Sequence, residues 1–276
     1  MMILSLVSGN PGFLCINLYL KRKRIEFRKA WFERAMKRAA IITARGGSKR
    51  IPKKNMKPFL GKPIIVYSIE AALGAGVFDE VMVSTDNEEI AGIAKQAGAK
   101  VPFFRSEKTS NDFATTAEVL EEVLFSYEQM GIFFDEVCCL YPTAPFVTAD
   151  AIRKAMQLLK EEHADSVIPV VKFSFPPQRC VVIRDGRLTP KWPENMAKRS
   201  QDLEPFYHDC GQFYCLNVAS FKKQKAIWME NVVPFVQDES SVQDIDTPED
   251  WKIAEMKYRL WQFESEPQIC LERSRK

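Results

Sequence analysis

The sequence predicts an α/β fold built on a Rossmann-like, mostly parallel sheet. Three observations predict it: short apolar runs alternate with segments of helical spacing, the first run ends in a glycine-bearing loop, and the composition is that of a globular protein. Of the 276 residues, 46% are hydrophobic and 27% are charged. A chain with this balance buries a full core, which excludes a disordered protein.

Each expected strand is a short apolar run, and each expected helix has apolar residues at helical spacing. The strands are expected at residues 39–43, 80–84, 100–104, 136–140, 166–171, 212–217 and 232–236. The helices are expected at residues 63–73, 87–97, 115–130, 149–162 and 248–263. Asp86 is expected to cap the second helix together with Glu89, as in a capping box, and Thr247 to cap the last helix.

The alternation breaks in residues 172–210, where proline, arginine and aromatic residues are frequent. Within this segment, Asp185-Gly186 separates two short apolar runs and predicts a hairpin turn. We interpret residues 172–210 as an insertion that leaves the core. The main domain is therefore expected at residues 37–263, with a polar, loosely held tail at residues 264–276.

Residues 1–36 differ in charge from the rest of the chain. The whole chain carries a formal charge of +3, whereas residues 1–35 hold seven basic and two acidic residues, a charge of +5. The remainder therefore carries −2, which argues against a nucleic-acid-binding surface on the main domain. We expect the N-terminal extension (residues 1–36) to be disordered, or residues 1–35 to precede a native start at Met36. The alternative is a peripheral membrane helix.

The chain is expected to be cytoplasmic, with no stable membrane association. The apolar stretches near its beginning are shorter than the roughly 20 residues that span a bilayer. Their basic residues follow them, whereas those of a secretory signal come first. Seven cysteines without any Cys-x-x-Cys pair argue against a disulfide framework and against a zinc site.

A glycine-rich, cationic loop is the strongest functional signal. The stretch A-R-G-G-S-K-R-I-P-K-K-N (residues 44–55) follows the first strand, at the end where open α/β sheets bind ligands. Two adjacent glycines let backbone N–H groups approach a phosphate. Arg45, Lys49 and Lys54 supply the cations that a triphosphate needs. The spacing is neither that of a P-loop nor that of the dinucleotide fingerprint. The alternative is a solvated basic loop.

Asp244 and Asp246 form a second candidate site. In an extended segment their side chains point to the same side of the chain. Two carboxylates suit Mg²⁺, which takes one or two of them together with phosphate oxygens and water. The alternative is that one aspartate only caps the following helix, but Thr247 is already placed for that role.

Further motifs are V-S-T-D (83–86), L-Y-P-T-A-P (140–145), R-S-Q-D (199–202) and Q-D-I-D-T-P-E-D (243–250). Together with the loop, they resemble the CMP-sugar-acid synthetases, the cytidylyltransferases that activate sialic acid and its relatives. The resemblance covers residues 37–260. Residues 173–179 and 208–214 resemble the members that use pseudaminic acid. Thr43 departs from the family, which usually has proline there.

The resemblance implies a fold of the nucleotide-sugar transferase type, in a homodimer whose insertion is a dimerisation arm that can reach the neighbouring site. It implies that CTP is bound by Ala44, Arg45, Gly46, Gly47, Ser48, Lys49, Lys54, Asn55, Arg105, Ala114 and Thr116. For the sugar acid it implies Tyr141, Thr143, Gln178, Arg179, Arg199, Gln201, His208 and Gln212. Asp244 and Asp246 would hold Mg²⁺, and the catalytic residues would be these two with Arg45, Lys49 and Lys54. Sialic acid synthetases commonly have glutamine at the position of Tyr141.

The implied reaction transfers CMP from CTP to the anomeric hydroxyl of a nine-carbon, sialic-acid-like sugar acid and releases pyrophosphate. Pseudaminic acid is the expected substrate, and N-acetylneuraminate, legionaminate and the eight-carbon acid Kdo are the alternatives. Another nucleoside triphosphate, or a catalytically inactive nucleotide-binding regulatory protein, also stays open. Surface charge for Arg105, a salt bridge for Arg199 and a structural hydrogen bond for His208 are the alternatives to ligand contact. The prediction requires that the loop and the two aspartates share one crevice.

Overall fold

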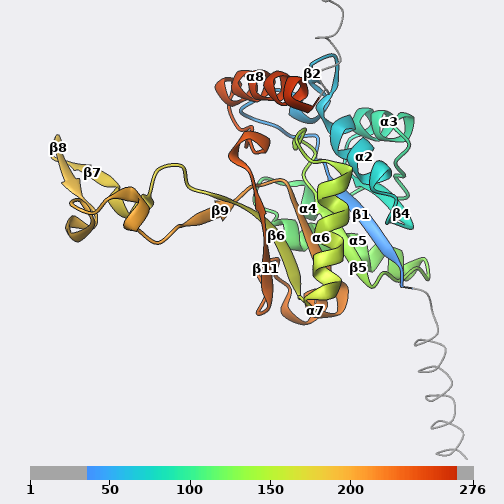
Figure 1. The fold of residues 1–276 in the computed structure, drawn as a ribbon. Coiled ribbons are helices and arrows are strands. Elements are labelled where there is room, and N and C mark those ends of the chain that lie inside the picture. Colours follow the sequence, from blue (N-terminus) through green and yellow to red (C-terminus); the bar gives the residue numbers. More distant parts are fainter. Residues whose placement is uncertain (1–35, 266–276) are drawn as a thin grey trace, which may run out of the picture. The chain divides into compact units, whose positions relative to one another are not determined.

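One mixed sheet of seven strands forms the centre of the computed structural model, which describes residues 36–265 (Figure 1). Six strands follow the order β11-β6-β10-β5-β1-β4, and β9 pairs with β6. The strands are β1 (Arg38–Thr43), β4 (Glu80–Ser84), β5 (Glu136–Leu140), β6 (Ser166–Lys172), β9 (Tyr207–Asp209), β10 (Phe213–Asn217) and β11 (Val232–Gln237). Short hairpins join β2 (Pro58–Phe59) to β3 (Lys62–Pro63), and β7 (Val181–Arg184) to β8 (Arg187–Pro190). The expectations for the extension before residue 36 and the tail after residue 265 lie outside the described residues.

The strand directions confirm the mostly parallel sheet. The parallel pairs are β1 with β4, β1 with β5, and β6 with β11. In contrast, β10 runs antiparallel to both of its neighbours, β5 and β6, and β9 runs antiparallel to β6. The carboxyl ends of β1, β4 and β5 therefore meet at one edge of the sheet, which is where a ligand crevice is expected.

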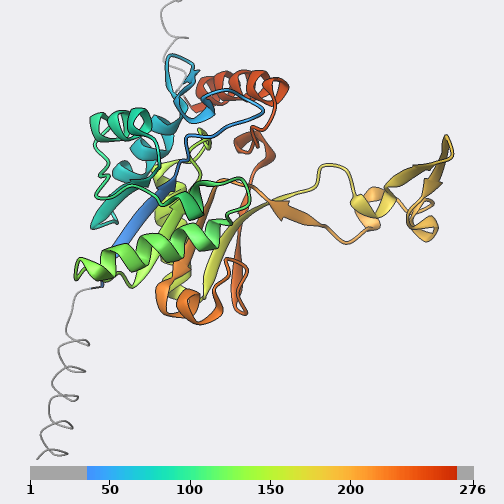
Figure 2. The same ribbon diagram turned by 180° about the vertical axis from the view of Figure 1, so that it is seen from behind.

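Helices cover both faces of the sheet, as Figures 1 and 2 show from opposite sides. They are α2 (Ile64–Ala75), α3 (Glu88–Gln96), α4 (Glu107–Ser110), α5 (Thr116–Gln129), α6 (Ala149–Glu161), α7 (Val218–Gln224) and α8 (Pro248–Ser265). On β1, Ala40 and Ile42 pack with α2, α3 and α6, whereas Ala39 and Ile41 pack with α5 and α7. This alternation follows from the two-residue period of a strand. Within residues 36–265, no helix combines the length and the apolar character needed to cross a membrane.

The prediction of a strand at residues 100–104 was wrong. Lys100 forms an isolated parallel bridge with Met82, and the chain continues in irregular form. Lys100 donates its N–H to Val81 and accepts from the N–H of Val83. The next ladder bond would have to come from Pro102, which has no N–H to donate. The pairing therefore stops after one residue.

The expected cap of the second helix was also wrong. Asn87, not Asp86, caps α3, and its side chain accepts a hydrogen bond from the N–H of Ile90. The Asp86 carboxylate instead accepts from the N–H of Gly46 at 2.7 Å. Both residue types cap helices well, so the local sequence does not decide between them. The tertiary contact with the glycine loop does.

A third apolar cluster ties the glycine-rich loop to the C-terminal helix. Ile51 and Phe59 are buried against Ile245 and Trp251. The Phe59 ring meets the Trp251 ring edge-on, with centroids 5.6 Å apart. Because this cluster joins residues from both ends of the described chain, it fixes where the loop and the aspartate segment lie relative to each other.

The segment between β6 and β9 leaves the sheet, as expected, and forms an arm that stands apart from it in both views (Figures 1 and 2). It holds β7, β8 and the 3₁₀ turns η2 (Pro177–Arg179), η3 (Pro193–Asn195) and η4 (Ser200–Asp202). Asp185 and Gly186 have φ of 49° and 70°, as a two-residue hairpin turn of type I′ requires. Ile183 and Leu188 pair across the hairpin and are 76% and 70% exposed. This apolar surface faces solvent in the single chain.

Candidate active site

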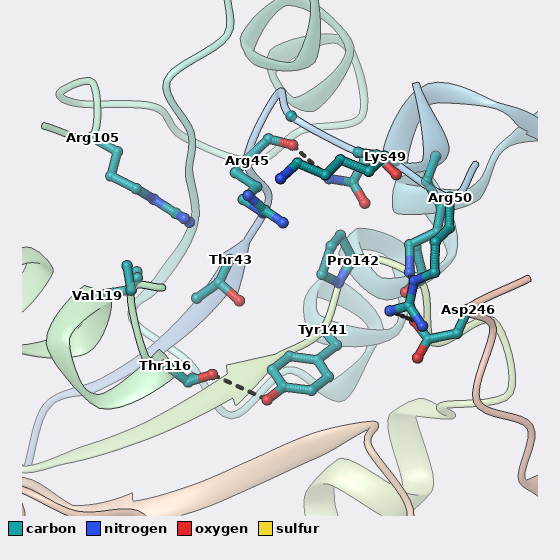
Figure 3. A pocket seen from close by; sticks show the side chains of 16 residues that line it. Thr43, Arg45, Lys49, Arg50, Arg105, Thr116, Val119, Tyr141, Pro142 and Asp246 are labelled. Atoms are coloured by element: carbon teal, nitrogen blue, oxygen red, sulfur yellow. Dashed lines mark hydrogen bonds and ion pairs between the residues drawn. The ribbon is translucent and has the colours of Figure 1, made fainter. Parts of the chain in front are cut away.

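A cleft of about 530 Å³ opens at the carboxyl ends of β1 and β5 (Figure 3). Figure 3 shows Arg105 at one end of it and Asp246 at the other. Arg45 and Lys49 lie between these ends. The lining residues are Thr43, Arg45, Gly47, Ser48, Lys49, Arg50, Lys54, Asn55, Arg105, Ala114, Thr116, Val119, Tyr141, Pro142, Thr143 and Asp246.

The backbone of the glycine-rich loop is held in place by two side chains. The Asn55 amide, which is buried, donates to the carbonyl of Arg45 at 2.9 Å. The N–H of Gly46 is taken by Asp86. A Cβ at Gly46 would lie 3.0 Å from the Cβ of Asn87, the residue that caps α3, so glycine allows the close approach of the loop at this point. The loop is therefore pre-formed before any ligand arrives.

The loop and the aspartate segment meet across the cleft, as the sequence prediction required. The Lys54 ammonium donates to the carbonyl of Ile245 at 2.8 Å and lies 3.5 Å from the Asp246 carboxylate. The Arg50 guanidinium lies 2.9 Å from the same carboxylate. The sequence analysis did not single out Arg50, although its place among the cations of the loop was a signal for it.

Asp112 is a second residue that the sequence analysis missed. Its carboxylate pairs with both the Arg45 guanidinium and the Lys49 ammonium. These hydrogen bonds, of which that from Lys49 has the larger effect and that from Arg45 the next, hold the pKa of the Asp112 carboxyl below its usual range. The one signal in the sequence was its position two residues before Ala114, in a stretch already expected to line the site.

Arg105 closes one end of the cleft and is 8% exposed, which excludes the alternative of an ordinary surface charge. Its guanidinium donates to the hydroxyl of Ser84 at 3.1 Å and to the Ser84 carbonyl at 2.7 Å. Burial lowers the pKa of this group, and the nearby charge of Asp86 acts in the opposite direction. The end of β4 thus holds a desolvated cation with hydrogen-bonding capacity beside Ala114 and Thr116.

Tyr141 presents its phenol to the cleft from the end of β5. The hydroxyl lies 3.0 Å from that of Thr116, a contact drawn in Figure 3. Behind it, the Tyr214 ring meets the Tyr141 ring edge-on at 5.5 Å, and the Tyr214 hydroxyl donates to Asp209 at 2.8 Å. Burial raises the pKa of the Tyr141 phenol, and its hydrogen bond with Thr116 acts in the opposite direction. The phenol is therefore a neutral, fixed hydrogen-bonding group.

Three of the expected residues belong to the site only indirectly. Ala44 is fully buried, and its N–H donates to the Ser84 carbonyl. Gly46 uses its N–H for Asp86. The buried Gln212 side chain donates to the Ser241 carbonyl and accepts from Gln237. These residues shape the cleft but lie outside its lining.

Asp244 lies beside the cleft rather than in its lining, close to Gly211, where a Cβ would be 3.9 Å from the carboxyl carbon. The residue as a whole is exposed to solvent. Even so, partial burial of the carboxyl group, followed by the charge of Asp246, raises its pKa. A cation close to Asp244 would stabilise its charged form and oppose this shift.

The expected sugar-acid residues of the arm lie away from the cleft of their own chain. Gln178 and Arg179 belong to η2, and Gln201 to η4. Arg199 forms a bidentate pair with Asp202, at 2.8 and 3.0 Å, which supports its structural alternative. The His208 imidazole lies against the Phe173 ring at the base of the arm, with centroids 4.7 Å apart and the ring planes tilted by 52°.

Comparison with known proteins gives concordant results. The sequence profile of the family described as Cytidylyltransferase matches residues 39–183. A pseudaminic acid cytidylyltransferase of Campylobacter jejuni is 38% identical over 226 residues, which are 82% of this chain and 97% of that protein. A CMP-N,N'-diacetyllegionaminic acid synthase of Legionella pneumophila is 37% identical over 233 residues, with the same coverage of 82% and 97%.

The fold has counterparts among solved structures. CMP:2-keto-3-deoxy-manno-octonic acid synthetase, complexed with CTP, matches with a TM-score of 0.59 at 19% identity, over 82% of this chain and 99% of that one. A 4-diphosphocytidyl-2C-methyl-D-erythritol synthase of Anaerococcus prevotii matches with a TM-score of 0.54 at 16% identity, over 81% and 99%. At such identities the likeness is one of fold. The sequence comparisons show more than a shared fold. This chain belongs to the cytidylyltransferase family.

Proposed function

We propose that this chain transfers CMP from CTP to the anomeric hydroxyl of pseudaminic acid, a nine-carbon sialic-acid-like sugar acid, and releases pyrophosphate. The observation that carries the proposal is a single cleft in which the cationic loop meets Asp246, with Tyr141 and Thr143 on the adjoining wall. The relatives named for pseudaminic acid, at 38% and 37% identity, support this sugar acid.

The cations of the cleft match a bound triphosphate. Arg45, Lys49, Arg50 and Lys54 all line it and all come from the one loop. Preorganised positive charge of this kind stabilises the charge that grows on a leaving pyrophosphate. The cytosine and ribose would lie toward Arg105, because its buried donors at the far end suit the carbonyl and ring nitrogen of a base.

A divalent cation, Mg²⁺ by its chemistry, fits the residues at the opposite end. Among residues 36–265, no group of three or more His, Cys, Asp or Glu side chains is arranged to hold a metal by itself. Mg²⁺ commonly uses only one or two carboxylates, with substrate phosphates and water as its other ligands. Asp246, with Asp244 beside it, supplies those carboxylates, and burial followed by the charge of Asp246 raises the pKa of Asp244, an effect that a bound cation would oppose. When bound, the ion would supply Lewis-acid stabilisation of charge on phosphate oxygens.

The chemistry of this chain is positioning and electrostatics. The anomeric hydroxyl attacks the α-phosphorus of CTP in line with the departing pyrophosphate, so one P–O bond forms as another breaks. Tyr141 and Thr143 orient the sugar acid, and the loop holds the triphosphate. Aligning two bound substrates in this way accounts for a large part of the barrier reduction in such transfers.

The arm supports a homodimer in which each subunit completes the sugar-acid site of the other. Gln178 Oε1 and Arg179 Nε are buried, yet neither has a hydrogen-bond partner among the residues that the structure describes. Both atoms are covered within the single chain, so pairing them with a second subunit would require this part of the arm to rearrange when the dimer forms. The exposed Ile183 and Leu188 of the hairpin give the same arm an apolar surface to bury.

A cytoplasmic location is part of the proposal. Five cysteines in the described chain, at positions 138, 139, 180, 210 and 215, carry free thiols. Reduced thiols of this number fit a reducing compartment.

Pyrophosphate release with CTP, Mg²⁺ and a panel of sugar acids tests the proposal. Pseudaminic acid is expected to give the highest kcat/KM. Legionaminic acid is the second candidate, because the Legionella pneumophila relative is 37% identical. N-acetylneuraminate and Kdo serve as the further comparisons, and UTP in place of CTP tests the nucleotide. Absence of CTP-dependent pyrophosphate release with every acid would contradict an enzymatic role and favour a nucleotide-binding regulatory protein.

A further inference from the structure

The carboxylate of Asp112 occupies the place where the proposed function puts phosphate. It contacts the Arg45 guanidinium and the Lys49 ammonium together, although Asp112 lies 67 residues after Arg45 in the chain. Both cations line the cleft, and the proposed function has both of them bind the triphosphate. A carboxylate is an anionic oxygen acceptor, as a phosphate is, so the two compete for the same donors.

The segment that carries Asp112 is anchored independently of this contact. At its start, the N–H and hydroxyl of Ser106 donate to the Glu122 carboxylate of α5, at 2.7 and 2.6 Å. At its tip, the Asn111 side chain accepts from the N–H groups of Phe113 and Ala114, at 2.8 and 3.0 Å. The Asp112 carboxylate can therefore leave the loop without disturbing the core.

The pairing is also solvent-exposed, which makes it displaceable. The side chain of Lys49 is 81% exposed, and those of Arg45 and Asp112 are 35% and 33% exposed. Phe113, next in the chain, is 92% exposed, so nothing in the described chain covers this turn. Ion pairs in such positions contribute little to stability, whereas a triphosphate brings several charges to the same cations.

We propose that Asp112 is an internal stand-in for phosphate: it holds Arg45 and Lys49 until CTP displaces it, and returns to them when pyrophosphate leaves. This inference rests on the proposed function. Asp112 acts through Arg45 and Lys49 and is a positioning residue, not a catalytic one. Its role is to keep two exposed cations in the cleft while lowering their affinity for the leaving pyrophosphate.

The test is calorimetric binding of CTP, inorganic pyrophosphate and cytidine to the wild type and to Asp112→Asn, which removes the charge and keeps the shape. Asp112→Asn is expected to bind CTP and pyrophosphate about threefold to tenfold more tightly, because two exposed ion pairs no longer compete. Cytidine, which has no phosphate, is expected to bind equally to both. In turnover assays, Asp112→Asn is expected to be more sensitive to inhibition by pyrophosphate to the same degree.

Glu107→Gln is the matched control, because Glu107 is an exposed acid in the same segment and its loss changes the net charge equally. It is expected to leave the pyrophosphate affinity unchanged. An unchanged or weaker affinity in Asp112→Asn would overturn the inference, as would an equal gain in Glu107→Gln, which would indicate only a general charge effect. A wild type that binds CTP no better than cytidine would instead contradict the proposed function itself.

Discussion

Asp246→Asn probes the junction between the loop and the aspartate segment. The Asp246 carboxylate lies 2.9 Å from the Arg50 guanidinium and 3.5 Å from the Lys54 ammonium, and the Asp246 side chain is 37% exposed. Pairs this open to water contribute about 0–1 kcal/mol each. The asparagine keeps the shape and one acceptor oxygen, so the free energy of unfolding is expected to fall by about 1 kcal/mol at most. The fold survives the change.

The turnover of Asp246→Asn is expected to change much more than its free energy of unfolding. Removing one preorganised electrostatic group from an active site costs about 10²–10³ in kcat, and loss of the charge also weakens the proposed Mg²⁺ site. We expect kcat for pyrophosphate release to fall about a thousandfold, which corresponds to about 4 kcal/mol of transition-state stabilisation. Initial rates with saturating CTP and sugar acid, together with a urea unfolding curve, measure the two effects on one preparation.

Glu249→Gln controls for charge alone, because Glu249 is an exposed acid three residues away in the first turn of α8. Its turnover is expected to stay within about twofold of the wild type, since first-turn charges act mainly on helix stability. Turnover of Asp246→Asn within tenfold of the wild type would refute the assignment of Asp246 to the reaction. A large loss of stability would instead show that Asp246 holds the loop in place.

Three further predictions concern the structure around the site. Phe59→Ala deletes a fully buried ring that meets three aromatic neighbours, and we expect urea unfolding to show a loss of about 3–5 kcal/mol; less than 1 kcal/mol would contradict the role of this cluster. Hydrogen bonds to the Asp165 carboxylate, of which that from Ser220 has the largest effect, hold its pKa below the unfolded value of about 3.9. The ionised carboxylate therefore stabilises the fold fully above that pH, and this contribution is lost as the pH falls through the folded pKa. Asp165→Asn should therefore flatten the stability profile below about pH 4, and an unchanged slope there would disprove this linkage. Ile183→Asp places a charge on the exposed hairpin, and light scattering should show a shift from dimer to monomer with an unchanged melting temperature at low concentration; an intact dimer would argue against the arm as the interface.

The local pattern of the chain was enough to predict most of the sheet. The strands at residues 80–84 and 136–140 have the bounds that their apolar runs predicted. The hairpin turn at Asp185-Gly186 also followed from two neighbouring residues. These features depend on interactions within a few residues, which the sequence displays directly.

Two expectations failed, one because of a partner far along the chain and the other because of a residue inside the expected strand. Asp86 was available to cap α3, but its carboxylate went to Gly46, 40 residues earlier. Residues 100–104 have a strand-like composition, yet Pro102 lacks the N–H that the edge of β4 would receive. Local propensity could not weigh the contact of Asp86, because the packing of separate elements sets it, whereas Pro102 was visible in the sequence.

The sequence by itself determined the chemistry of this protein: a glycine-rich loop with its cations, two aspartates near the end, and the motifs of a cytidylyltransferase. Only the tertiary structure decided which charges meet. It brought Lys54 to Asp246 across 192 residues, and Asp112 to Arg45 across 67. The reason is physical: an ionic side chain acts over a few ångströms in space, and sequence separation sets no limit on which charges folding places within that range.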